Sequence, residues 1–254
     1  MFITSFCSFV RLYSIFLFIF IFHMTSTKNL LSKRGKNNLL TKENLKILNN
    51  QKEDQNLISV KRIPYDEVFV QSKIFRMAAA AYGSVDNFIY CLQTLTGSYD
   101  VFFDIQIPCL TNETCTGFMA LSLEDKALIL SFGTSKYAYK QLLNDSGESV
   151  FNKRRRSPLG FGSGMVSDDL FSIFYQMQLA GITQKTFEMI QFFDGYDLWI
   201  TGHSIGGAIA SIAAAKIASA NVIDAKQIKL VTFGQPRVGN KAWAAAMENA
   251  VGNF

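Results

Sequence analysis

The stretch that decides the fold reads Leu198-Trp-Ile-Thr-Gly-His-Ser-Ile-Gly-Gly-Ala208. A short apolar run leads into a glycine-bracketed turn and then into an alanine-rich segment, Ile205–Ala220, which is typical of a strand, a tight turn and a helix. A second apolar run, Ile228–Phe233, follows. Two strands joined by a helix form a βαβ unit, whose strands lie parallel in one sheet. The sequence therefore predicts an α/β fold.

Segments upstream extend this unit. The patterns predict helices over Tyr65–Tyr82 and over Asp168–Gln191, the latter with a weak point at Gly181, and strands over Gly117–Leu121, Ala127–Phe132 and Tyr196–Thr201. We therefore expect one domain over residues 63–254, with a central, mostly parallel sheet and helices on both faces.

Ser204 is the candidate nucleophile. Gly-His-Ser-Ile-Gly matches the G-x-S-x-G pattern, in which a strained strand-to-helix turn exposes a serine. The small residues around it allow the helix to pack closely on the strand, and the helix N-terminus offers the N–H of Ile205 to a developing oxyanion. The alternative is a glycine-rich turn in which Ser204 only caps the helix. The strand and helix around the serine favour the nucleophile.

A second oxyanion donor is expected from the loop after an earlier strand. The run Ala127–Phe132 leads directly into Gly133 and Thr134, and Thr134 can offer both its N–H and its hydroxyl. An ordinary strand-ending turn is the alternative. The glycine-rich residues 160–164 have neither a P-loop lysine nor a dinucleotide pattern, so no cofactor is expected.

The general base that such a serine needs has no candidate after Ser204 in this sequence. A serine hydroxyl is a poor nucleophile unless an adjacent base takes its proton. The chain has two histidines, His23 and His203, and after Ser204 the acidic residues are Asp224 and Glu248. Neighbouring side chains in a tight turn project in different directions, so we expect His203 to pack or to hydrogen-bond locally. The sequence after Ser204 therefore offers no histidine that could serve as its base.

Two segments resemble the class 3, or fungal-lipase-like, serine hydrolases of the α/β-hydrolase fold, namely Trp199–Ala208 and Val231-Thr-Phe-Gly-Gln-Pro-Arg-Val-Gly-Asn240. The strand that ends Ser131-Phe-Gly-Thr134 is similar to the family's oxyanion strand, although the family has an arginine where this chain has Phe132. The resemblance runs from about Tyr65 to the C-terminus.

The resemblance implies a hydrolase of acylglycerols or related lipids that forms an acyl-enzyme at Ser204, with Ile205 and Thr134 holding the oxyanion. It also implies a lid over Ser135–Leu143 that opens at a lipid–water interface, although a surface helix fits that segment equally well. By the same resemblance, the last strands of the sheet, the triad's acid and its histidine would lie beyond Phe254. For lack of that histidine, residues 1–254 alone should be inactive. Alternatives are a non-catalytic secreted lipid-binding protein on a hydrolase scaffold, a phospholipase A1 and a feruloyl-type esterase.

The N-terminal residues predict secretion. Arg11 precedes the apolar run Leu12–Phe22, which is too short to cross a bilayer, because a crossing needs about 20 residues. Residues 1–27 are thus expected to be a signal peptide, with an uncleaved anchor as the alternative. Residues 28–62 hold nine Lys or Arg, three Asp or Glu and no aromatic residue, as in a flexible linker or propeptide. Because the basic excess lies there, no nucleic-acid partner is expected.

The cysteines and sequons agree with secretion. Asn112 and Asn144 lie in N-x-S/T sequons, and Cys109 and Cys115 bracket the first of them. If Cys7 is removed with the signal peptide, Cys91, Cys109 and Cys115 remain, which leaves one cysteine as a free thiol or with a partner outside this sequence. The basic run 153–156 is expected to be a solvated loop.

Overall fold

The computed structural model describes residues 65–82, 89, 91–92, 98–110, 113–135, 154–156 and 164–251, all within the compact unit Arg62–Phe254. The expected signal peptide, the expected linker, both sequon asparagines (Asn112 and Asn144) and the expected lid after Ser135 lie outside the described residues.

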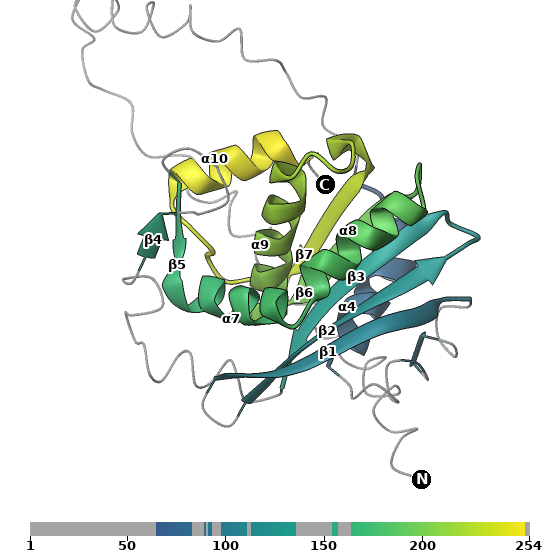
Figure 1. The fold of residues 1–254 in the computed structure, drawn as a ribbon, viewed down its shortest axis with the longest axis horizontal. Helices are drawn as coiled ribbons and strands as arrows, with labels where there is room; N and C mark the ends of the chain where they lie inside the picture. Colours follow the sequence, from purple (N-terminus) through teal and green to yellow (C-terminus); the bar gives the residue numbers. More distant parts are fainter. Residues whose placement is uncertain are drawn as a thin grey trace, which may run out of the picture. The chain divides into compact units, whose positions relative to one another are not determined.

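One sheet organises the described part of the chain (Figure 1). Its strands are β1 (Asp100–Leu110), β2 (Glu113–Ser122), β3 (Ala127–Thr134), β6 (Asp197–His203) and β7 (Ile228–Phe233), hydrogen-bonded in the order β1-β2-β3-β6-β7. The β1–β2 and β2–β3 pairs are antiparallel, whereas β3–β6 and β6–β7 are parallel. The predicted α/β sheet is confirmed as a mixed sheet whose parallel part contains the expected βαβ unit.

Helices cover both faces, as predicted. On one face α9 (Ile205–Ser219) packs against β3, β6 and β7, and α7 (Asp168–Leu179) and α8 (Ile182–Phe192) lie beside it. On the other face α4 (Phe75–Ala80) contacts the same three strands; it continues a helical segment formed by α3 (Glu67–Phe69) and the π-helical turn η1 (Val70–Ile74). The last described helix, α10 (Lys241–Ala250), packs against α9.

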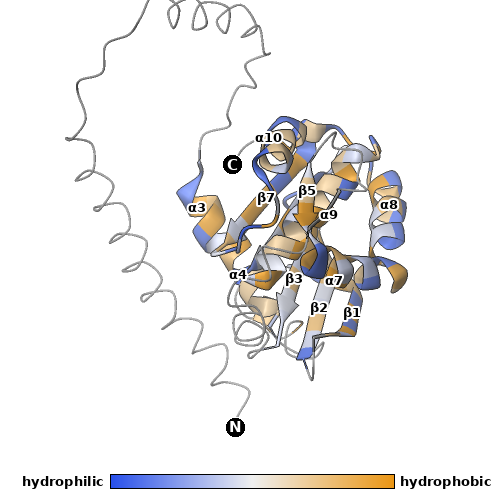
Figure 2. Ribbon diagram, turned by 90° about the vertical axis from the view of Figure 1, so that its left-hand side faces the viewer, coloured by the Kyte–Doolittle hydropathy of each residue, from blue (hydrophilic) through white to orange (hydrophobic). Residues whose placement is uncertain are grey.

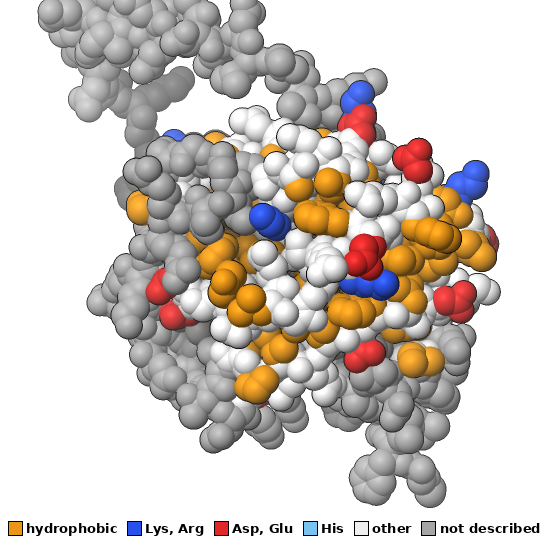
Figure 3. Space-filling model, viewed as in Figure 1, with side chains coloured by type: hydrophobic (Ala, Val, Ile, Leu, Met, Phe, Trp, Pro, Cys, Tyr) orange, Lys and Arg blue, Asp and Glu red, His pale blue; other side chains and the backbone are white. Residues whose placement is uncertain are grey.

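The core explains why these residues form these elements. All eight residues of β3 are buried, as expected of a strand covered on both faces. Helix α9 is buried on nearly every side, and Figure 2 shows it mostly in hydrophobic colours. The outer helices expose a few large apolar side chains, Tyr175 and Leu179 on α7 and Phe192 on α8, and Figure 3 shows hydrophobic side chains on this face of the molecule. The apolar βαβ unit is therefore the centre of the domain.

Two predictions about elements need correction, and one strand was missed. The helix expected over Asp168–Gln191 is two helices, because Gly181 adopts a left-handed backbone, with φ 98°, between α7 and α8. The loop expected over residues 153–156 contains strand β4 (Arg154–Arg156), which pairs with β5 (Met165–Ser167) in a separate two-stranded sheet. Strand β1 was not predicted at all.

The described cysteines are all in disulfides. Cys109 and Cys115 pair across the end of the β1–β2 hairpin, and Cys91 is also disulfide-bonded. The expectation of a free thiol is therefore wrong for the described cysteines. Within the described ranges, no helix is both long enough and apolar enough to cross a membrane.

Candidate active site

Ser204 occupies the sharp turn between β6 and α9. Its backbone has φ 55° and ψ −123°, a conformation that a residue with a side chain rarely adopts. The turn is fixed to the neighbouring strand, because the N–H of Ser204 donates to the carbonyl of Phe233 at 2.9 Å. This is the strained strand-to-helix geometry of a nucleophile elbow.

The Ser204 side chain does not cap the helix. It makes no capping hydrogen bond to α9, although Ser204 stands at the N-cap position. At the start of α10, by contrast, the side-chain oxygen of Asn240 accepts the N–H of Trp243 at 2.9 Å. The alternative of an ordinary capping serine therefore does not describe this turn.

Two glycines let α9 begin directly against the sheet. A Cβ on Gly206 would lie 2.3 Å from the carbonyl oxygen of Phe132 on β3, and a Cβ on Gly202 would lie 2.4 Å from the backbone of Gly206. Any side chain at either position would push the helix away from the strands. The glycines of the motif thus set the close approach that brings the N-terminus of α9 next to the end of β3.

Thr134 and Ser204 lie at the same edge of the sheet, where the parallel strands β3 and β6 end. In the parallel β3–β6 pair, Phe132 is opposite Gly202, and Thr134 and Ser204 each follow two residues later. Thr134 is buried, with 3% of its surface exposed. The N–H of Ser135 donates to β2, and since successive N–H groups of a strand point to opposite sides, that of Thr134 points toward β6.

Ile205 supplies the other expected donor. It is the first residue of α9 and is fully buried. The N–H groups of the first helical turn have no acceptor within the helix, and the helix dipole favours negative charge there. The structure therefore brings the three sequence-predicted residues, Ser204, Ile205 and Thr134, to one edge of the parallel strands.

His203 is engaged by Tyr82. Its Nδ1 lies 2.6 Å from the Tyr82 hydroxyl, and the two rings are tilted with their centroids 5.7 Å apart. Burial lowers the pKa of His203, which favours the neutral imidazole. His203 thus packs and forms a hydrogen bond, as expected, but its partner belongs to a distant segment of the sequence and not to a local one. The sequence placed Tyr82 only at the end of a helix, and no local pattern could pair residues so far apart along the chain.

Neither acidic residue that follows Ser204 completes a triad in the described part of the chain. Asp224 caps the short helix η3 (Ala225–Gln227), accepting the N–H of Lys226 at 2.9 Å, before β7 begins. Ser204 lies instead beside the other end of β7, at Phe233. Glu248 is an exposed residue of α10. The described residues also contain no group of three or more His, Cys, Asp or Glu side chains that could hold a metal ion.

Comparisons with known proteins agree with this geometry. The family described as lipase (class 3) matches residues 129–254. The Caenorhabditis elegans protein named lipase ZK262.3 is 38% identical over 74 residues, which cover 27% of this chain and 21% of that protein. The matched part thus spans about a fifth of this relative's length.

Solved structures of fungal lipases share the fold. Lipase II from Rhizopus niveus aligns with a TM-score of 0.61 at 20% identity, covering 75% of this chain and 71% of that chain. The lipase from Rhizopus microsporus var. chinensis aligns with a TM-score of 0.59 at 19% identity, covering 76% and 69%. The expected α/β-hydrolase architecture is confirmed by these neighbours.

Proposed function

Because this chain belongs, through residues 129–254, to the class 3 lipase family, we propose that the protein is a secreted serine ester hydrolase that acts on acylglycerols or related lipids at a lipid–water interface. The single observation that carries the proposal is the backbone of Ser204, held at φ 55° between β6 and α9 with its hydroxyl free of any capping role. Such a strained turn is costly and is typical of sites where it serves chemistry.

The proposed reaction begins at the Ser204 hydroxyl. Its oxygen attacks the ester carbonyl carbon while a general base takes the hydroxyl proton. The tetrahedral oxyanion accepts hydrogen bonds from the N–H of Ile205 and from Thr134. Collapse of the intermediate releases the alcohol, which takes up the proton, and leaves an acyl-enzyme at Ser204. Water then hydrolyses that acyl-enzyme, and the fatty acid leaves.

His203 is not proposed as the base, because neighbouring side chains in a tight turn project in different directions and its ring packs against Tyr82. We instead assign the base and its acid partner to sequence that is absent from these 254 residues. Residues 1–254 alone should therefore turn over about 10⁶-fold more slowly than an enzyme with a complete triad.

The test is hydrolysis by the natural full-length protein, made through a secretory pathway. Trioleoylglycerol emulsions, phosphatidylcholine vesicles and a feruloyl ester distinguish a lipase from a phospholipase A1 and from a feruloyl-type esterase. We expect activity on the acylglycerol that Ser204→Ala abolishes. Ser219→Ala is the matched control, because the Ser219 hydroxyl donates to the Lys216 carbonyl within the last turn of α9, at the opposite end of that helix from Ser204. Binding of fatty acid without hydrolysis of any ester would replace the proposal with a lipid-binding protein.

A further inference from the structure

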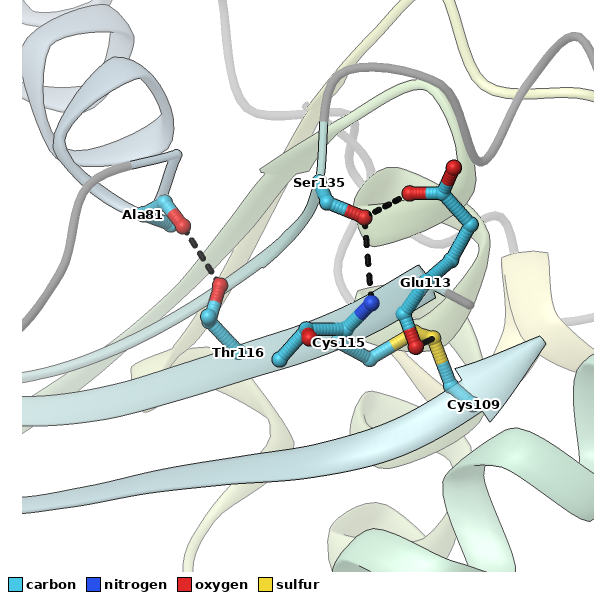
Figure 4. The surroundings of a disulfide bond; sticks show 7 residues. Ala81, Cys109, Glu113, Cys115, Thr116 and Ser135 are labelled. Carbon is cyan, nitrogen blue, oxygen red and sulfur yellow. Dashed lines mark hydrogen bonds between the residues drawn. A yellow bond between two sulfur atoms is a disulfide. The ribbon is translucent and has the colours of Figure 1, made fainter. Parts of the chain in front are cut away.

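Ser135, the residue after β3, forms a reciprocal pair with Thr114 on β2. The Ser135 N–H donates to the Thr114 carbonyl at 2.7 Å, and the Thr114 N–H donates to Ser135 Oγ at 3.0 Å. The Ser135 hydroxyl also donates to the Glu113 carboxylate, as Figure 4 shows. One serine thus uses its backbone, its hydroxyl oxygen and its hydroxyl proton on two consecutive residues of β2.

This pair stands where the strand ladder ends. The register of β2 with β3 ends at Cys115 opposite Thr134, so Ser135 extends the pairing by one residue past the candidate oxyanion donor. The last residues of a strand open most easily, because fewer bonds hold them. The bonds of Ser135 to β2 therefore restrict the backbone of Thr134 directly.

The start of β2, where Glu113 and Thr114 lie, is itself well anchored. The Cys109–Cys115 disulfide fixes it to β1, and the buried Thr116 hydroxyl donates to the Ala81 carbonyl at the end of α4 (Figure 4). The carbonyl and the N–H of Thr114, which bond Ser135, thus lie beside residues that are tied to β1 and to the end of α4. They can therefore hold the backbone of Thr134 in one position.

We propose that Ser135 is a positioning residue for ester hydrolysis, which sets the orientation of the Thr134 N–H toward the oxyanion through its bonds to Thr114 and Glu113. This inference rests on the proposed function. An oxyanion donor is effective only when it is preorganised, and a small misplacement lowers the rate of the chemical step far more than it lowers substrate binding. Ser135 itself touches no reacting atom.

The test measures kcat and KM of the natural full-length protein with Ser135→Ala, on a soluble short-chain ester. We expect kcat to fall about 10-fold with KM unchanged. Ser135→Thr, which keeps the hydroxyl, should restore most of kcat, and Glu113→Gln, which keeps an acceptor oxygen, should lose less than Glu113→Ala. Affinity for an alkyl boronate, which mimics the tetrahedral intermediate, should fall in parallel with kcat.

Two outcomes separate this inference from the proposed function. If the wild-type protein hydrolyses no ester, the proposed function fails and the inference fails with it. If the wild type is active but Ser135→Ala keeps its kcat and boronate affinity, only the positioning role is overturned. A fall in melting temperature with kcat unchanged would likewise show a merely structural serine. Ser219→Ala serves as the control and should leave kcat unchanged.

Discussion

The hydroxyl of Tyr82 and Nδ1 of His203 lie 2.6 Å apart, so the residue just past α4 holds the residue just before Ser204. The carbonyl of Ala81, next to Tyr82, is in turn bonded by Thr116 on β2. The elbow is thus braced from the face of the sheet opposite α9 (Figure 1). The start of β2 also bonds Ser135, through the N–H of Thr114. The first residues of this one strand therefore support both sides of the candidate site.

Removing this brace should weaken the fold measurably. Tyr82→Phe keeps the ring but deletes the hydroxyl, which leaves Nδ1 of the half-buried His203 without this partner. We expect the free energy of unfolding to fall by about 1 kcal/mol. Urea denaturation followed by fluorescence measures it. Tyr175→Phe, at an exposed position on α7, is the matched control, and equal stability of the two variants would contradict the assignment.

The stability contributed by neutral His203 should depend on pH. Burial lowers its pKa in the folded state below the ordinary value of 6.5. The folded state therefore binds this proton less readily than the unfolded state does, so stability is retained above pH 6.5 and is lost as pH falls through the folded-state pKa. Urea midpoints measured from pH 8 to pH 4.5 should decline more steeply for the wild type than for His203→Gln. Parallel declines would contradict this.

Gly206 should tolerate no side chain. In Gly206→Ala the new methyl carbon would lie 2.3 Å from the Phe132 carbonyl oxygen, so α9 must shift away from β3. We expect a loss of at least about 2 kcal/mol in the free energy of unfolding, together with loss of esterase activity. Ala218→Gly, which opens space near the end of the same helix, should cost only about 1 kcal/mol. A Gly206→Ala protein of wild-type stability would contradict the close approach.

Asp125 should stabilise the domain far from the site. Burial alone would raise its pKa, but hydrogen bonds from Lys73 and Tyr99 and the positive charge of Lys73 lower the pKa overall, below the ordinary 3.8. This contribution is present above that value and is lost as pH falls through the folded-state pKa. Asp125→Asn should reduce stability at pH 7 by about 1–2 kcal/mol.

The Asp125→Asn difference should shrink as pH falls below the ordinary value of 3.8 and through the lower folded-state pKa, because the wild-type carboxylate then takes up a proton. Denaturation at pH 7 and pH 3 measures it, with exposed Glu124→Gln as the control. Activity at pH 7 should be unchanged, since Asp125 lies in the β2–β3 turn, at the opposite end of β3 from Thr134. A difference that stays constant with pH would contradict the assignment.

The sequence predicted the centre of the fold well, for a physical reason. Strand β6, the elbow, α9 and β7 are largely apolar and follow one another closely along the chain, so their local pattern and their tertiary environment agree. Strand β1 is an edge strand that contains Asp104, Gln106 and Pro108. Its alternation of Phe103, Ile105 and Ile107 was the available signal, but the polar residues between them hid it.

The contacts around the elbow could not be predicted in the same way. Tyr82 meets His203, and Ser135 meets Thr114, only because the sheet brings separate segments together. A pattern read within one segment carries no information about such pairs. The motif residues Ser204, Ile205 and Thr134 were found because each one ends or begins an element, which is a local property of the sequence.

The most direct test of the central claim is covalent labelling of the natural full-length protein with an alkyl fluorophosphonate, followed by mass spectrometry of the peptide that contains Ser204. The phosphorus should form a bond to the Ser204 oxygen with loss of fluoride, and the adduct should be absent in Ser204→Ala and in the unfolded protein. A folded, full-length protein that carries no adduct at Ser204, or carries it on another residue, would contradict the account of Ser204 as the nucleophile.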